Sequence, residues 1–355
     1  MPLDRIQPIY CDTEVDGAGA STYGTDAVPA LTDALVVMNP EIKVDSTVIN
    51  RKMRSQLLRP MYTGVVGQKS MSATFETFMA GYGGGAIDAN TKFPAFHHLL
   101  QSCGFVGDFA VATWTYTMPD AGWGQLSSTI YAYKHGLLYK MVGTRGNAAW
   151  TFQAGQPCRA AWSMNSLFTA PAAAAETIPD YTTGTTGLID SSPPICVGSV
   201  MDFTPYANAP TIGQFGLIDS VTIDLRNQVI PRMGTNFGST DVSEWLITGH
   251  GTDDDDGILV SMDLEVPDMG AGEEAAWWNR FFAAAGPEID RTVGDLNITV
   301  GAGAGKVMVW QLGGLAPLTI EDITLDGGRL GHRVTFKALG TDGSTGEDDL
   351  VITCT

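Results

Sequence analysis

Apolar and polar residues alternate along many short stretches of the chain. This pattern is typical of β-strands with one buried face, because successive side chains of a strand point to opposite sides. Gly and Pro occur 42 and 18 times, as turns between many short strands require. We therefore expect strands at 34–45, 69–79, 113–118, 127–134, 137–142, 148–153, 159–168, 217–226, 244–250, 258–266, 296–300, 306–312, 318–325 and 329–339.

Two segments depart from this pattern and predict short helices. Residues 94–104 have Pro at the start and Gly at the end, with apolar residues on one face. Residues 273–286 start with two acidic residues and end on Gly, as the helix dipole and the C-cap favour. The aromatic pairs of this second helix are better explained by core packing than by a ligand platform.

The order of the predicted elements repeats along the chain, which predicts a duplication. The 355 residues are enough for two domains that each bury an apolar core. Residues 171–210 are low in charge and rich in Ala, Thr, Gly and Pro, as a linker would be. We predict a mainly β (α+β) chain of two tandem β-sandwich or barrel domains, each flanked by one helix, with an N-terminal arm at 1–33, domains at 34–170 and 211–355, and the linker between them.

The chain is acidic, with a formal net charge of −19. Surfaces that grip nucleic acid neutralise phosphates with clustered Lys and Arg, so this charge argues against DNA binding. An acidic surface would instead suit the lining of a conduit, through which a polyanion passes without sticking. Ordinary acidic solubility explains the same charge and stays open. No apolar run approaches the ~20 residues that cross a bilayer, and no secretion signal is recognised, so we expect no membrane association.

Motifs of known chemistry are incomplete in this sequence. The segment Gly301–Lys306 lacks the residues of a phosphate-binding loop, which favours a turn between strands. Asp253–Asp256 resembles a calcium loop in composition but not in register, which favours a solvated acidic loop. His97 and His98 are adjacent on the first predicted helix, where they would point about 100° apart at its surface and could not share a metal.

The cysteines are equally uninformative about chemistry. The five are scattered without a CxxC spacing, so neither a zinc cluster nor a disulfide framework is predicted, and assembly in a reducing cytoplasm fits. No nucleophile motif is recognisable. We therefore expect no enzyme, no catalytic residue, no cofactor and no metal.

One segment is basic in this acidic protein. From Lys43 to Lys69 the chain has six of its 20 basic residues and a single acid, Asp45. A solvated loop is one interpretation, and the other is a loop that contacts another copy in an adjacent ring and meets its acidic residues. The expected contact residues are Lys43, Arg51, Lys52, Arg54, Arg59 and Lys69. The acidic candidates for contact or lumen are Asp253, Asp254, Asp255, Asp256, Glu347, Asp348 and Asp349.

Several passages in residues 34–170 resemble the tail tube proteins of tailed bacteriophages. The similar passages are Arg51–Ser55, Tyr62–Glu76, Pro94–Phe105 and Ser127–Asn147. They are patterns of strand and turn residues without chemically diagnostic positions. The second half resembles this family only through its repeated order of elements.

The resemblance implies a structural virion protein. In that family, small barrels with one helix assemble into rings of six units, the rings stack through a long loop between early strands, and genomic DNA passes through the lumen. Two fused units per chain then imply a trimer with pseudo-sixfold symmetry. The implied partners are other copies of the chain, tape-measure, baseplate and terminator proteins and a sheath in some tails, with assembly in the bacterial host cytoplasm and DNA passing without specific binding. The alternatives are a baseplate hub, a tail terminator, or a decoration or receptor-binding protein.

Overall fold

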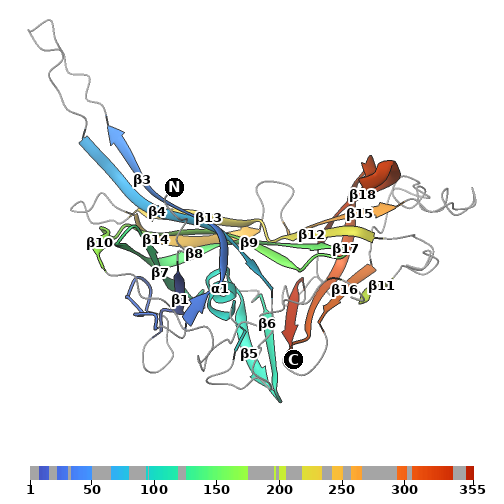
Figure 1. Ribbon diagram of the computed structural model, residues 1–355, viewed down its shortest axis with the longest axis horizontal. Coiled ribbons are helices and arrows are strands. Elements are labelled where there is room, and N and C mark those ends of the chain that lie inside the picture. Colours follow the sequence, from blue (N-terminus) through green and yellow to red (C-terminus); the bar gives the residue numbers. More distant parts are fainter. Residues whose placement is uncertain are drawn as a thin grey trace, which may run out of the picture.

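The structure, a computed structural model, consists mainly of antiparallel β-strands (Figure 1). This confirms the predicted mainly β class. The residues that the structure describes are 8–15, 22–30, 33–49, 65–79, 93–94, 96–118, 125–174, 196, 200–204, 218–233, 242–250, 257–265, 294–301, 306–338 and 349–355.

The described strands divide into a first half, β1 to β10, and a second half, β11 to β19. The first half contains β1 (Ile9–Thr13), β2 (Ala34–Leu35), β3 (Val37–Ile49), β4 (Val65–Phe78), α1 (His97–Ser102), β5 (Val106–Ala110), β6 (Thr113–Thr117), β7 (Ser128–Lys134), β8 (Leu137–Gln153), β9 (Arg159–Leu167) and β10 (Ala172–Ala173). The second half contains β11 (Val200–Thr204), β12 (Ile218–Asp224), β13 (Asn227–Met233), β14 (Val242–His250), β15 (Leu259–Glu265), β16 (Gly294–Val300), β17 (Met308–Leu325), a 3-10 turn (Asp326–Gly328), β18 (Arg329–Ala338) and β19 (Val351–Cys354).

A broad antiparallel layer of eight strands crosses the molecule, in the order β3-β4-β9-β8-β12-β15-β18-β17. In Figure 1 this layer lies above α1, β1, β5 and β6. The first four strands belong to the first half and the last four to the second, and they join where β8 pairs with β12. The two halves therefore share one continuous sheet.

Two long strands, β8 and β17, change pairing partners along their length. The start of β8 pairs with β7 and its end with β9, while the start of β17 pairs with β16 and its end with β18. We predicted two separate strands in each of these places, with a turn around residues 145–147 in the first. Each strand instead has a glycine with positive φ near its bend, Gly143 (64°) and Gly314 (60°), a conformation in which glycine has no steric cost. The strand changes direction there and stays paired.

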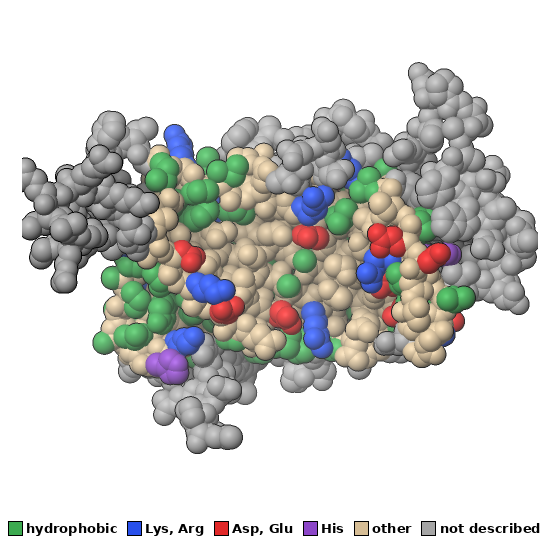
Figure 2. Space-filling model, turned by 90° about the horizontal axis from the view of Figure 1, so that it is seen from above, with side chains coloured by type: hydrophobic (Ala, Val, Ile, Leu, Met, Phe, Trp, Pro, Cys, Tyr) green, Lys and Arg blue, Asp and Glu red, His purple; other side chains and the backbone are tan. Residues whose placement is uncertain are grey.

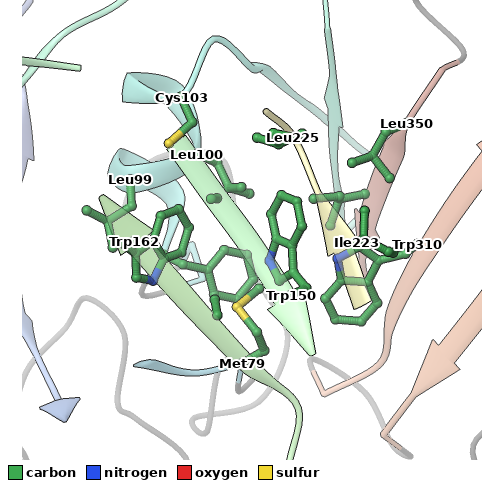
Figure 3. Packing of buried hydrophobic residues seen from close by; sticks show 14 of the residues in the cluster. Met79, Leu99, Leu100, Cys103, Trp150, Trp162, Ile223, Leu225, Trp310 and Leu350 are labelled. Atoms are coloured by element: carbon green, nitrogen blue, oxygen red, sulfur yellow. The ribbon is translucent and has the colours of Figure 1, made fainter. Parts of the chain in front are cut away.

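One apolar core extends through both halves. Phe96, Leu99 and Leu100 of the predicted first helix are buried as expected. In Figure 3, Leu99 and Leu100 on α1 lie beside Trp150 and Trp162, with Trp310 on the other side of Trp150. Phe152 contacts Trp310 edge to face at 4.8 Å between ring centroids. Because β8 and β17 supply these rings, the core ties the two halves together.

The expected closed barrels are absent from the described part of the chain. No set of its strand pairings forms a closed circuit. The reason is that β8 uses its outer side to pair with β12, while β3 is left as an open edge. The predicted second helix, 273–286, lies outside the described residues.

The predicted arm and linker both contain strands. Ile9, Tyr10 and Cys11 of β1 are buried, and β1 pairs with β7 and β2, so residues 9–13 are not an extended arm. Within the linker range, β10 pairs with β8, and β11 pairs with β16. The sequence signal was weak because these strands are short or lack a clear alternation of polar and apolar residues.

His97 is buried and His98 is half-buried, contrary to the predicted surface position. His97 Nδ1 is 2.8 Å from the Tyr116 hydroxyl, and His98 Nδ1 is 2.7 Å from Thr13 Oγ1. Burial and the neighbouring His98 hold the pKa of His97 well below its usual range. Burial lowers the pKa of His98 to about 4, although Asp33 acts in the opposite direction. The pair is therefore neutral at pH 7 and helps to join α1 to β6 and β1.

Acid should destabilise the protein through these histidines. An unfolded histidine titrates near pH 6.5, so the folded state binds fewer protons and stability is lost as the pH falls from about 6.5 towards 4. For His98 the loss by pH 4 is about 3 kcal/mol. We expect urea unfolding at pH 7, 6, 5 and 4 to show a steeper loss in the wild type than in His98→Gln. Parallel curves would contradict this assignment.

Candidate functional site: the junction between the two halves

Six strand pairings of the first half recur in the second half in the same order. The pairings β1–β7, β3–β4, β4–β9, β7–β8, β8–β9 and β8–β10 correspond to β11–β16, β12–β15, β15–β18, β16–β17, β17–β18 and β17–β19. All twelve are antiparallel. The first half adds β2, β5 and β6, and the second half adds the hairpin of β13 and β14.

The two halves meet along two strand junctions. β12 pairs with β8 from Ser220 opposite Gln153 to Asp224 opposite Ala149, and the Leu225 amide extends this ladder to the Ala148 carbonyl at 3.1 Å. On the other side of the core, the C-terminal strand β19 lies between β17 and β6. Backbone hydrogen bonds thus satisfy strand edges that would otherwise be open.

A buried arginine anchors the β13–β14 hairpin to the first half. Arg145 of β8 is almost fully buried, and its guanidinium donates to the carbonyls of Trp245 (2.5 Å) and Gln125 (2.9 Å). It also lies 3.4 Å from Glu244 Oε1 and over the ring of Tyr23, 4.7 Å from its centroid. The Trp245 amide in turn donates to the Tyr23 hydroxyl at 2.7 Å. The charge is therefore paired and hydrogen-bonded, as a buried charge requires.

Further hydrogen bonds fix the register of this hairpin. The amide side chain of Gln125 donates to the Ile247 carbonyl at 2.7 Å and accepts from the Ile247 amide at 3.2 Å. Asn227, the first residue of β13, donates through Nδ2 to the carbonyls of Cys103 (2.7 Å) and Gly146 (2.9 Å). β14 lies against β8, β9 and β4. The second half thus extends a hairpin onto the first half.

The repeated pairings allow the two halves to be aligned residue by residue. The β8–β9 and β17–β18 turns each contain a glycine with positive φ, Gly155 (76°) and Gly327 (82°). Counting from these glycines matches Met164 of β9 with Phe336 of β18. Directly opposite residues on neighbouring strands form a row across the sheet. The row through Met164 ends at Ile42 on β3, and the row through Phe336 reaches Ile223 on β12.

The two matched edge strands differ in what covers them. Ile223 and Leu225 are both 0% exposed, because β8 lies beside β12. At the matching positions on β3, Ile42 is half-buried and Val44 is 45% exposed. Among the described strands β3 pairs only with β4, so it is an open edge with apolar side chains at positions that are covered in the second half.

The end of β17 is the second open edge of the eight-stranded layer. In the alignment it matches the part of β8 that pairs with β12, with Ile320 at the place of Ala148 and Glu321 at the place of Ala149. In the described part of the chain, residues 319–325 of β17 pair only with β18. The layer therefore ends on two edges that correspond to the two sides of its internal junction.

The face of this layer opposite α1 is polar, with few charges. One row across five neighbouring strands consists of Thr151, Thr222, Ser261, Thr335 and Thr319. Figure 2 shows this side, with basic and acidic side chains scattered over a surface that is mostly neither charged nor hydrophobic. Part of the charge is paired, as between Arg333 and Asp263 at 2.7 Å. Such a surface has no basic cluster that would hold a polyanion.

The basic segment is shorter as a loop than we predicted. Lys43 and Lys69 lie on β3 and β4, which remain paired as far as Ile49 and Val65. Lys43 is exposed and lies 3.1 Å from Glu41, whereas Lys69 lies over the ring of Phe168 at 5.0 Å. Residues that lie outside the described part of the chain are Arg51, Lys52, Arg54, Arg59, Asp253, Asp254, Asp255, Asp256, Glu347 and Asp348.

Asp349 is half-buried, ahead of β19. β16 and β17 pair up to Val300 opposite Met308. Of the glycine-rich segment between them, residues 302–305 lie outside the described part of the chain, so the predicted turn stays a prediction. The described residues contain no group of three or more side chains suited to a metal. Nor does any helix among them have the length and apolarity to span a bilayer.

No protein-family model and no curated protein matches this sequence.

The residues that make the junction have little signal in the sequence. Arg145 lies at a position where we predicted a turn, and Gln125 and Asn227 lie outside any recognisable motif. The only signal was an arginine next to a glycine. The role of that arginine became clear once the structure showed which groups it contacts. The junction depends on residues about 100 positions apart, as between Arg145 and Trp245.

Loss of the Arg145 side chain should destabilise the chain strongly. Arg145→Met leaves the carbonyls of Trp245 and Gln125 without this donor, so we expect the free energy of unfolding to fall by about 3 kcal/mol. The control is Arg159→Met on the neighbouring β9. Arg159 is exposed, so its loss should change stability by no more than about 0.5 kcal/mol. Urea unfolding measures both, and equal effects would contradict the anchoring role.

Proposed function

We propose that the chain is a structural protein that self-assembles into stacked rings forming a bacteriophage tail tube. The observation that supports this most directly is the internal junction together with its two open counterparts. β8 and β12 join two halves with the same pairings, and β17 and β3 present the matching edges at the ends of the layer. A second copy can then repeat between chains the junction that each chain makes internally.

In this proposal, the two halves are tandem copies of one tail-tube unit. The end of β17 in one copy pairs with β3 of the next, antiparallel and in the register of the internal junction. That register places Lys43 opposite Glu321 and Val44 opposite Ile320. One pair is oppositely charged and the other apolar, and both combinations stabilise cross-strand neighbours.

Pairing of unlike edges is a head-to-tail contact, which forms a ring if the rotation closes and a filament if it does not. The resemblance to tail tube proteins favours a closed ring of three chains, hence six units. The hydroxyl-rich face of the layer would then line the lumen, where DNA passes without specific binding. The chain would be part of the virion, with the tape-measure, baseplate and terminator proteins as further partners, and would need no catalytic site or cofactor.

A baseplate hub or tail terminator would use the same edges in a single ring. The number of stacked rings separates these alternatives from a tube. Electron microscopy of the purified protein should show hollow tubes rather than isolated rings.

A disulfide can test the proposed edge pairing. In the alignment, Lys43 and Glu321 correspond to Asp224 and Ala149. That pair is next to the hydrogen-bonded pair of Leu225 and Ala148, so it is itself a non-hydrogen-bonded pair. Side chains of such pairs lie close together, which makes Lys43 and Glu321 suitable for a disulfide. We expect Lys43→Cys/Glu321→Cys to form intermolecular disulfides under mild oxidation, with a covalent trimer on a non-reducing gel. The described native cysteines are all buried and should not interfere.

The matched control for the disulfide is Lys43→Cys/Asp322→Cys. A shift of one residue places the second thiol on the opposite face of the strand, so crosslinking should fall sharply. Equal crosslinking in both variants would contradict the register. Absence of any oligomer from the wild type and from both variants would contradict the proposed assembly.

DNA should not bind the assembled protein at physiological salt. Six or more phosphate contacts would require a basic surface, whereas the chain carries a net charge of −19. A gel shift with micromolar protein and duplex DNA should show no complex. A shift that weakens with salt would indicate a basic lumen and contradict the proposed lining.

A further inference from the structure

The hairpin of β3 and β4 extends well beyond the body of the molecule, whereas its counterpart in the second half does not (Figure 1). The hairpin of the first half follows β1 and the short β2, and the hairpin of the second half follows β11. In the second half, the chain continues from β12 into β13 and returns through β14 to β15. In the first half, β3 and β4 are uninterrupted and supply the same two strands and their extension.

The counterpart hairpin has a known binding surface within the chain. β13 and β14 lie on the first half, where Trp245 and Ile247 are buried and Arg145 anchors the Trp245 carbonyl. Docking begins at Asn227, which bonds to Gly146 and Asn147 of β8. The surface used is the adjoining region of β8, β9 and β4.

The β3–β4 hairpin lacks such a surface in its own chain. Ser46 matches Asn227 in the alignment, and residues 43–47 of β3 are all exposed. The surface that corresponds to β8, β9 and β4 is formed by β17, β18 and β15 of the second half. Leu318 lies on this surface, at the bulge of β17. The bulge corresponds to Gly146 and Asn147 of β8, and the Leu318 side chain is 37% exposed.

We propose that the β3–β4 hairpin of one copy clasps the second half of the adjacent copy in the same ring, across β17, β18 and β15, as β13 and β14 clasp the first half within the chain. This proposal rests on the proposed ring. It differs from the sequence-based expectation of a contact between stacked rings. Pairing of β3 with β17 and the clasp are continuous, because the hairpin begins where that pairing ends.

The charge pattern of the sequence supports this partner. Four basic residues, Arg51, Lys52, Arg54 and Arg59, follow β3, and four aspartates, 253–256, closely precede β15. On the proposed receiving surface, Leu259 at the start of β15 lies opposite Lys337 of β18. Lys337 in turn lies opposite Ala316 of β17. Along the sequence, a basic segment thus follows the proposed clasping strand, and an acidic segment precedes the proposed receiving strand. Opposite charges at such an interface favour correct pairing and make it sensitive to salt.

The register of the hairpin allows a clean shortening. Ile49 pairs with Val65, so replacing residues 50–64 with Asn-Gly gives a two-residue hairpin turn. The clasp predicts that the shortened protein keeps the thermal midpoint of the wild-type monomer but that its ring dissociates at least tenfold more readily. A dilution series by mass photometry measures ring dissociation, and electron microscopy measures tube length.

The surface variants Leu318→Asp and Leu330→Asp supply the matched comparison. Leu330 is 75% exposed beside the β17–β18 turn, at the opposite end of β17's pairing with β18 from Leu318. We expect Leu318→Asp to weaken the ring and Leu330→Asp to leave it unchanged. In the shortened protein, Leu318→Asp should weaken the ring less than it does in the full-length protein, because the shortening and the substitution remove the same contact.

The outcomes separate the clasp from the ring itself. Unchanged ring dissociation with shortened or absent tubes would overturn the clasp in favour of a contact between rings, and would leave the proposed function intact. Full additivity of Leu318→Asp and the shortening would also overturn it. Wild-type protein that forms no ring at any concentration would overturn both proposals.

Discussion

The structure depends on how the open edges of a large antiparallel sheet are satisfied. Unpaired amides and carbonyls at a strand edge favour pairing with another strand, whether ordered or not. Within the chain, β8 pairs with β12 and β19 fills the space between β17 and β6. These junctions turn two halves into one body. They also leave β3 and β17 as the edges at which the same pairing can continue.

The internal junction combines a hydrogen-bonded ladder with a buried polar anchor. Burial of the Arg145 guanidinium is tolerable because carbonyls, a carboxylate and an aromatic ring surround it. Such a site tolerates few alternative arrangements, so it specifies where the hairpin lies. The apolar core around Trp150 and Trp310 supplies stability on the other side of the layer. The position of the hairpin and the stability of the core thus depend on different residues.

The exposed side chains of β3 acquire a meaning through comparison of the halves. Val44 taken alone is an ordinary exposed valine, and single exposed apolar residues are common. Its counterpart Leu225 is fully buried by a neighbouring strand, which indicates what kind of partner is missing. The same comparison gives the proposed contact a register, with Lys43 opposite Glu321. An internal repeat can therefore define an intermolecular interface more closely than surface composition can.

The sequence by itself determined the strand-rich class, the first helix and the paired strands around the turns at Gly155 and Gly327, because alternation and turn residues are local signals. It could not determine the burial of His97 and His98, since the two residues are on α1 but their partners lie on β6 and β1. It also split β8 and β17, because a glycine that bends a paired strand looks the same in sequence as one that ends it. The anchor at Arg145 and the two open edges were decided by tertiary structure alone. They arise from pairing between distant residues, which leaves no periodic pattern along the chain.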